Sequence, residues 1–217
     1  MRKIKIFFMR KLFKKVKRIF NRINNGQLYF SGDYYLSSLR RYDDLDTYLY
    51  LFKKKNNQHD LYTDKEICFS SKLKFGSSIK EFKSEISSQR PKVTKKTALG
   101  FDVFVYKIKV GGHRAKLEVH FSQDKLFYFS YTFRKVYTQD TKEIVDVLCM
   151  KYLNTSNSDY SNNSIIDNFK NRIEIIEDGA KLKINYLSAD IDFLYSAKDE
   201  MDMKIDKLNR KEIYSKL

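Results

Sequence analysis

Residues 104–121, FVYKIKVGGHRAKLEVHF, alternate apolar and polar side chains on both sides of a Gly-Gly pair. A two-residue hairpin loop needs backbone conformations with positive φ, which glycine adopts readily. With Gly111-Gly112 as the loop, each apolar residue of one strand faces an apolar residue of the other: Tyr106 with Leu117, Phe104 with Val119, and Ile108 with Ala115. The segment therefore predicts a β-hairpin, and its glycines are explained by the turn.

The next segment, KLFYFSYTF (125–133), predicts a third strand after a three-residue loop at 122–124. Its alternating aromatic side chains are expected on the apolar face of the hairpin: Phe127, Phe129, Tyr131 and Phe133. The histidines of the hairpin, His113 and His120, are an odd number of positions apart. On a regular strand they point to opposite sides, so we expect them to share neither a metal ion nor a substrate.

The other face of the predicted sheet is basic. It carries Lys107, Lys109, Arg114 and Lys116, together with Glu118, His120 and Tyr128. Such a face could bind an anion or RNA, and we favour the alternative, a face that is simply solvated.

The pattern of a helix followed by strands then recurs along the chain. Ser78 and Glu81 have the spacing of a capping box and predict a helix over about 78–88. A second helix is expected over 140–153, and a polar loop over 154–164. A second hairpin is expected around Asp178-Gly179, with Ile175 opposite Leu182 and Ile173 opposite Ile184. A strand at 191–195 and a charged helix over about 197–215 complete the chain.

These elements predict an α+β fold: antiparallel β-meander sheet or sheets with helices on one face, in the order helix-βββ-helix-βββ-helix after a basic N-terminal helix. The expected parts are a basic amphipathic helix (1–25), a Tyr-rich segment of the body (26–75) with a short strand at 46–52, and two helix-plus-meander units (76–136 and 137–217). We expect residues 76–217 to form one compact domain. Their element order resembles the tandem helix-plus-sheet units of the β-lactamase inhibitor protein fold, which implies a binding protein.

The N-terminal segment, MRKIKIFFMRKLFKKVKRIFNRINN, holds ten of the 43 Lys and Arg residues and no acid. Spaced at about 100° per residue, its side chains from residue 8 to residue 23 separate into two faces. The apolar face includes Phe8, Leu12, Val16 and Phe20, and the basic face is formed by Arg10, Lys11, Lys14, Lys15, Lys17, Arg18 and Arg22.

A helix of this kind suits an anionic membrane surface, and it also suits nucleic acid, an acidic protein partner or packing on the body. The segment lacks the long apolar run of a signal peptide or a membrane span. Both cysteines, Cys68 and Cys149, lie among apolar residues and are expected to be free thiols. We therefore expect a cytoplasmic protein, at the inner face of the membrane or free of it.

No catalytic motif stands out. The seven glycines form no phosphate-binding loop, and the patterns of zinc proteases, α/β-hydrolases and cysteine nucleophiles are missing. Two Asp-x-Asp pairs, at 44–46 and 190–192, are expected to be structural. The sequence identifies no cofactor, metal site or small-molecule substrate, and favours a protein that is not an enzyme.

Three functions fit these patterns. The leading hypothesis is a non-catalytic binding or adaptor protein held at an anionic surface, most readily a peripheral membrane site, by its basic N-terminal helix. The formal net charge of +16 at pH 7 also fits a nucleic-acid-binding protein that uses this helix and the basic sheet face. The third hypothesis is an enzyme whose site no motif reveals.

Overall fold

The computed structural model describes residues 31–54, 59–155 and 163–216. They form an α+β fold around one mixed sheet, in which eight strands lie in the order β1-β6-β7-β8-β5-β4-β3-β2. All neighbours are antiparallel except β1 and β6. The strands are β1 (His59–Tyr62), β2 (Val93–Lys96), β3 (Asp102–Val110), β4 (His113–Ser122), β5 (Lys125–Arg134), β6 (Asn163–Ile166), β7 (Arg172–Asp178) and β8 (Lys181–Leu187).

Pairing between β5 and β8 joins the two halves of the chain into this single sheet. The sheet belongs to one compact unit, Leu39–Leu217, while Met1–Ser38 form a second unit. The described part of the second unit, residues 31–38, belongs to helix α2 (Ser31–Leu39). Within the described ranges, none of the helices combines the length and the apolar character that a bilayer span requires.

The first hairpin, β3–β4, has the predicted register. Tyr106 lies opposite Leu117, and Phe104 lies opposite Val119. Gly111 and Gly112 both have positive φ, +54° and +86°. The two-residue turn is therefore confirmed.

Gly112→Val should lower the free energy of unfolding by roughly 2 kcal/mol, because a β-branched side chain resists the positive φ at this position. Gly111→Asn is the matched control: asparagine tolerates left-handed backbone, so this variant should lose less. Urea unfolding of both variants measures the difference. Equal stability of Gly112→Val and the unaltered protein would contradict the turn conformation.

The turn between β4 and β5 is shorter than predicted. Ser122 pairs with Lys125, so the loop consists of two residues, Gln123 and Asp124, both with positive φ. The register shifts after His120, which leaves Phe127 as an extra residue on β5. Such a bulge turns a side chain to the other face. Phe127 therefore packs against Tyr48 and Phe101, and not beside Phe129 as predicted.

The second hairpin, β7–β8, forms with a register two residues away from the prediction. Ile175 lies opposite Ile184 and Ile173 opposite Tyr186, and the loop is 179–180. A slip of two residues keeps every side chain on its face, so the alternation of apolar and polar residues does not distinguish the two registers.

Two predicted strands are helical. Residues 46–52 belong to helix α3 (Leu45–Phe52), which begins after Asp44, whose side chain accepts a hydrogen bond from the Asp46 amide. Residues 192–195 begin helix α6 (Asp192–Lys216), which starts about five residues before the predicted position. Leu194 is buried on the body, and the described side chains from Lys198 onward are exposed. The third strand of the second half is β6, which precedes the hairpin.

The other two predicted helices are present. Helix α4 (Ile79–Glu85) begins with the predicted capping box, in which Glu81 accepts from the Ser78 amide and the Ser78 hydroxyl accepts from the Glu81 amide. Helix α5 (Thr138–Leu153) begins after Tyr137, and Asp140 accepts a hydrogen bond from the Tyr137 amide.

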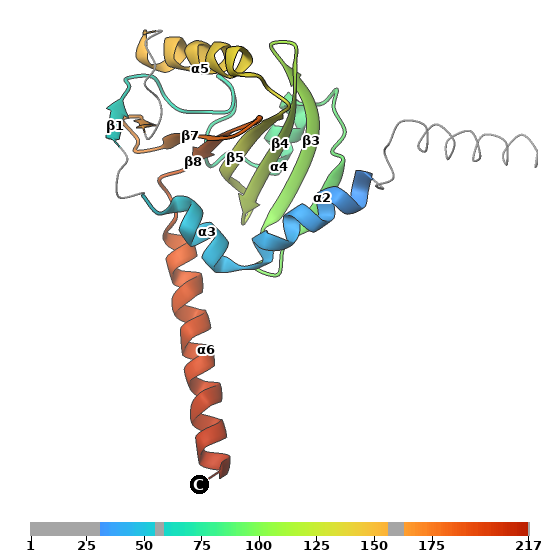
Figure 1. Ribbon diagram of the computed structural model, residues 1–217. Helices are drawn as coiled ribbons and strands as arrows, with labels where there is room; N and C mark the ends of the chain where they lie inside the picture. Colours follow the sequence, from blue (N-terminus) through green and yellow to red (C-terminus); the bar gives the residue numbers. More distant parts are fainter. Residues whose placement is uncertain (1–30, 55–58, 156–162, 217) are drawn as a thin grey trace, which may run out of the picture. The chain divides into compact units, whose positions relative to one another are not determined.

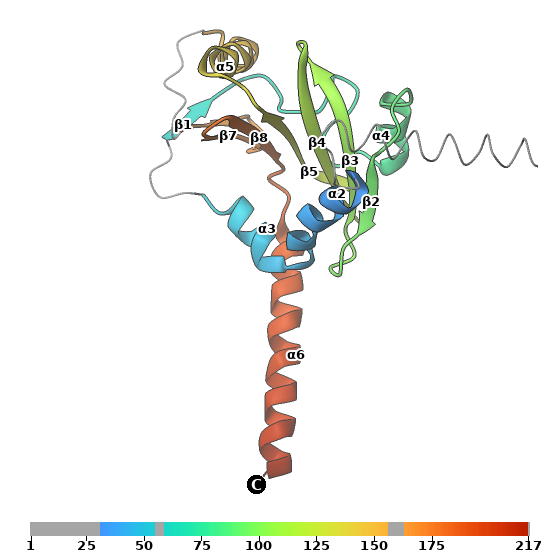
Figure 2. The ribbon, with the colours of Figure 1, turned by 45° about the vertical axis from the view of Figure 1, so that its right-hand side comes forward.

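Helices cover both faces of the sheet, and not one face as predicted (Figure 1). Phe82 of α4 packs against Tyr106 and Phe121, on the same face as the buried residues of α5. The short 3₁₀ helix η1 (Arg40–Asp43) and α3 cover the other face, where Tyr48 reaches His120. Figure 2 shows α5 and α3 on opposite sides of the strands. The apolar core lies between the sheet and the α4–α5 layer.

Candidate functional site

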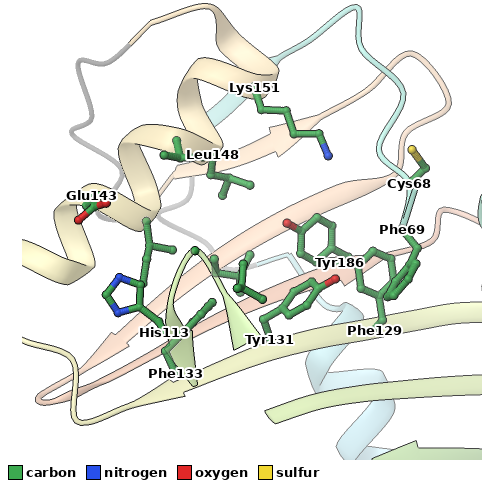
Figure 3. Close-up of a pocket in the computed structure, with 15 residues that line it drawn as sticks. Cys68, Phe69, His113, Phe129, Tyr131, Phe133, Glu143, Leu148, Lys151 and Tyr186 are labelled. Carbon is green, nitrogen blue, oxygen red and sulfur yellow. The ribbon is translucent and has the colours of Figure 1, made fainter. Parts of the chain in front are cut away.

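A cavity of about 260 Å³ lies between α5 and the sheet (Figure 3). We call it the α5 cavity. Its floor is formed by Phe129, Tyr131 and Phe133 of β5 with Ile184 and Tyr186 of β8. Its roof comes from Glu143, Ile144, Val147, Leu148 and Lys151 of α5, and its ends from Cys68, Phe69, Val110, Gly111 and His113.

The local sequence explains why these side chains meet. Alternate residues of β5 point to one face, which gives the aromatic floor. On α5, Ile144, Leu148 and Lys151 follow each other at spacings of three and four residues and therefore share one side of the helix. Most of the lining is apolar, as in typical ligand sites.

Two neighbouring tyrosine rings belong to the floor and lie on the side of Lys151, away from Glu143 (Figure 3). Tyr186 stacks on Phe129 with ring centroids 4.3 Å apart, and Tyr131 meets Tyr186 edge to face at 5.8 Å. Burial raises the pKa of both hydroxyl groups well above the usual value, so both remain protonated at neutral pH. Neither hydroxyl forms a hydrogen bond with another described residue. Figure 3 shows both hydroxyl groups on the cavity side, below α5.

Lys151 and Cys68 lie at one end of the cavity, and Glu143 and His113 lie toward the other (Figure 3). The Lys151 ammonium group is 4.7 Å from the centre of the Tyr152 ring. Burial raises the pKa of the Cys68 thiol, and nearby Lys151 offsets only part of this effect. Cys68 is therefore a neutral thiol at pH 7 and a poor nucleophile. Both cysteines are free, as predicted.

A second polar cluster lies on the opposite face, under η1. The Glu118 side chain is fully buried and accepts hydrogen bonds from Lys116 at 2.8 Å and from the Tyr42 hydroxyl at 3.2 Å. Arg41 lies 3.5 Å from the same carboxylate. Burial alone would raise the pKa of Glu118, but Lys116, Lys183, His120 and Arg41 together lower it to about 2. Glu118 is therefore a buried anion that ties η1 to the sheet.

His120 is also fully buried, beside Glu118. Its Nδ1 shares a hydrogen bond of 2.9 Å with the Tyr48 hydroxyl, and the rings of Tyr42 and Tyr128 lie 4.5 and 4.8 Å away. Burial lowers its pKa to about 3, which keeps the imidazole neutral. The predicted separation of the histidines is confirmed, since His113 borders the α5 cavity on the other face. The prediction that His120 lies on a solvated face is wrong, because the side chain is fully buried.

The four residues of the predicted basic face lie side by side on β3 and β4. Lys107 is opposite Lys116, and Lys109 is opposite Arg114. Lys107, Lys109 and Arg114 are exposed, whereas Lys116 is largely buried in its ion pair with Glu118. The row continues through Thr132 to Lys183 of β8, because Thr132 pairs with both Lys116 and Lys183. Sequence reasoning missed Lys183 because the β5–β8 pairing was not predicted.

The residues proposed for surface binding at the N-terminus lie outside the described residues: Phe8, Arg10, Lys11, Leu12, Lys14, Lys15, Val16, Lys17, Arg18, Phe20 and Arg22. Of the expected Asp-x-Asp pairs, Asp44 caps α3 and Asp192 begins α6. In residues 31–54, 59–155 and 163–216, no group of three or more His, Cys, Asp or Glu side chains could hold a metal ion.

No protein-family model, curated protein sequence or solved structure matches the chain. The resemblance to the β-lactamase inhibitor protein fold therefore has no support from these comparisons.

Proposed function

We propose that this is a non-catalytic binding protein that holds a small, largely apolar molecule in the α5 cavity and acts at an anionic membrane surface. The apolar cavity below α5 is the observation that carries the proposal. Its volume of about 260 Å³ lies just under the range of about 300–1,000 Å³ that is usual for ligand sites, which favours a small ligand.

The residues around the α5 cavity suit binding better than catalysis. Nucleophilic catalysis needs an activated nucleophile with a base in hydrogen-bond reach. Cys68 is kept neutral by burial, and the hydroxyl groups of Tyr131 and Tyr186 are held in their protonated form. Aromatic and aliphatic walls with a few polar groups instead supply affinity through burial of apolar surface.

Val147→Trp should block the α5 cavity, because Val147 borders it and is 66% exposed, so a larger side chain fits there without disturbing the core. We expect the affinity for octanol, measured by titration calorimetry, to fall by roughly tenfold or more, since the apolar surface that the alcohol buries is lost. Met150→Trp is the matched control, since Met150 is also exposed on α5 but does not border the cavity. Octanol binding that survives in Val147→Trp, or that is absent from the unaltered protein, would contradict the proposal.

Membrane association rests on the sequence of residues 1–25. The full-length protein should bind vesicles that contain anionic lipid and should be released as salt rises, since each Lys or Arg near such a surface contributes about 1 kcal/mol. Changing Phe8 and Phe20 to Ser should remove the part of the binding that salt does not reverse. Vesicle co-sedimentation and thermal unfolding measure the two effects. A lower melting temperature with no vesicle binding by the intact protein would assign the segment to the core instead.

A nucleic-acid-binding function is the second candidate, supported by the exposed basic side chains of Lys107 and Lys109 on β3 and of Arg114, opposite Lys109, on β4. Exposed basic side chains that lie together on one face of a sheet suit the phosphates of a single strand. In this case Lys107→Glu should weaken the binding of oligonucleotides and reduce its salt dependence, while Lys80→Glu on α4 should change neither. Filter binding at several salt concentrations would decide, and an intact protein that binds no oligonucleotide would exclude this candidate.

A further inference from the structure

The polar groups of the α5 cavity are unevenly placed, and they limit which molecule can occupy it. This inference rests on the proposed ligand-binding function. The hydroxyl groups of Tyr131 and Tyr186 reach the cavity without a hydrogen-bond partner among the described residues, and Lys151 adds a positive charge at the same end (Figure 3). A hydroxyl group that reaches an apolar cavity costs free energy unless a ligand satisfies it.

We propose that the ligand is a small aliphatic carboxylic acid, whose carboxylate accepts hydrogen bonds from the Tyr131 and Tyr186 hydroxyl groups near Lys151 and whose chain fills the apolar part of the cavity. A carboxylate can accept from both hydroxyl groups at once. Hydrogen bonds to an ionised acceptor are stronger than those to a neutral one.

The charges around the cavity also set the direction of the ligand. Glu143, toward the opposite end, repels a carboxylate, and Lys151 attracts it, so both favour the same orientation. The chain then lies along Phe133, Ile144 and Leu148, which are apolar and border the cavity. An amine of the same length would meet Lys151 at the end where the hydroxyl groups are.

Octanoate, octanol and octylamine provide the test, because they share one chain and differ in the head group. We expect octanoate to bind roughly tenfold more tightly than octanol, and octylamine to bind most weakly. Tyr131→Phe with Tyr186→Phe should reduce octanoate affinity by roughly tenfold or more and change octanol affinity little. Lys151→Met should reduce octanoate affinity by roughly fivefold.

Matched controls separate these effects from changes in the fold. Tyr137→Phe and Lys142→Met alter exposed residues at or near the start of α5 that do not border the cavity, and both should leave octanoate binding unchanged. The tyrosine variants should keep the melting temperature, because the deleted hydroxyl groups form no hydrogen bond with the described residues. If octanol binds as tightly as octanoate, and Lys151→Met has no effect, the proposal of a carboxylic-acid ligand is wrong, while the proposal that the cavity binds an apolar molecule is retained. If neither compound binds, the proposed function itself fails.

Discussion

Replacing Glu118 with leucine should lower the free energy of unfolding by about 3–5 kcal/mol at pH 7, the range for removing one partner of a buried ion pair. The Lys116 side chain is only 11% exposed, and its ammonium group donates to the Glu118 carboxylate at 2.8 Å. Without the carboxylate, this cation stays largely buried and uncompensated. The Tyr42 hydroxyl also loses its acceptor. Urea unfolding measures the loss.

A double variant isolates the ion pair. Glu118→Leu with Lys116→Met removes both charges, and we expect it to recover stability to within about 1 kcal/mol of the unaltered protein, because apolar side chains can replace a buried pair at little cost. Glu85→Leu on α4, at an exposed position, should change stability by less than about 0.5 kcal/mol. If Glu118→Leu were as mild as Glu85→Leu, Glu118 would not be the anion that holds η1 on the sheet.

The second large effect is a loss of stability in mild acid that His120 causes. Its pKa is about 3 in the folded protein, against an ordinary value of 6.5. Below pH 6.5 the unfolded chain therefore binds a proton at His120 that the folded protein does not bind. The contribution of neutral His120 to the free energy of unfolding is fully present above pH 6.5. It falls as the pH is lowered toward 3, with a limiting slope of about 1.4 kcal/mol per pH unit.

Two variants identify the source of this slope. His120→Gln cannot titrate, so its stability should be lower at pH 7 but should fall less between pH 6.5 and pH 5. His59→Gln, at an exposed position on β1, should keep the original slope. Glu118 does not interfere in this range, because its pKa is lowered from 4.5 to about 2, and its contribution is lost only as pH falls below about 4.5. An unchanged slope in His120→Gln would show that other groups cause the acid sensitivity.

Part of the fold could be predicted because local geometry determines it. The β3–β4 register follows from two glycines and a strict alternation, and the capping box of α4 from Ser78 and Glu81. The β7–β8 register could not be predicted in the same way, since two registers that differ by two residues bury the same face. Helix α3 was mistaken for a strand because nearly all its residues from Tyr48 to Phe52 are apolar, which hides the helical period.

The polar cluster around Glu118 and His120 and the α5 cavity could not be predicted from the sequence. Both depend on contacts between distant parts of the chain. A strand at 46–52 would leave Glu118 and His120 uncovered, so the sequence predicts a solvated face there, whereas helix α3 covers His120 in the structure. The aromatic residues of β5 were predicted as core, and most of them are. That Tyr131 and Tyr186 share a cavity depends on the pairing of β5 with β8 and on the position of α5, neither of which a local pattern encodes.

The parallel pair of β1 and β6 also affects how the protein folds. Asp60 and Ser164, which meet through a hydrogen bond between these strands, are 104 residues apart in the sequence. The β3–β4 and β7–β8 hairpins close short loops. Strand β1 can pair with β6 only after β6 has paired with β7, and this pairing closes a loop through a long intervening stretch of chain. It also lies at the edge of the sheet and has four residues. We therefore expect β1 to be the last strand acquired in refolding and the first to exchange its amide hydrogens by local opening.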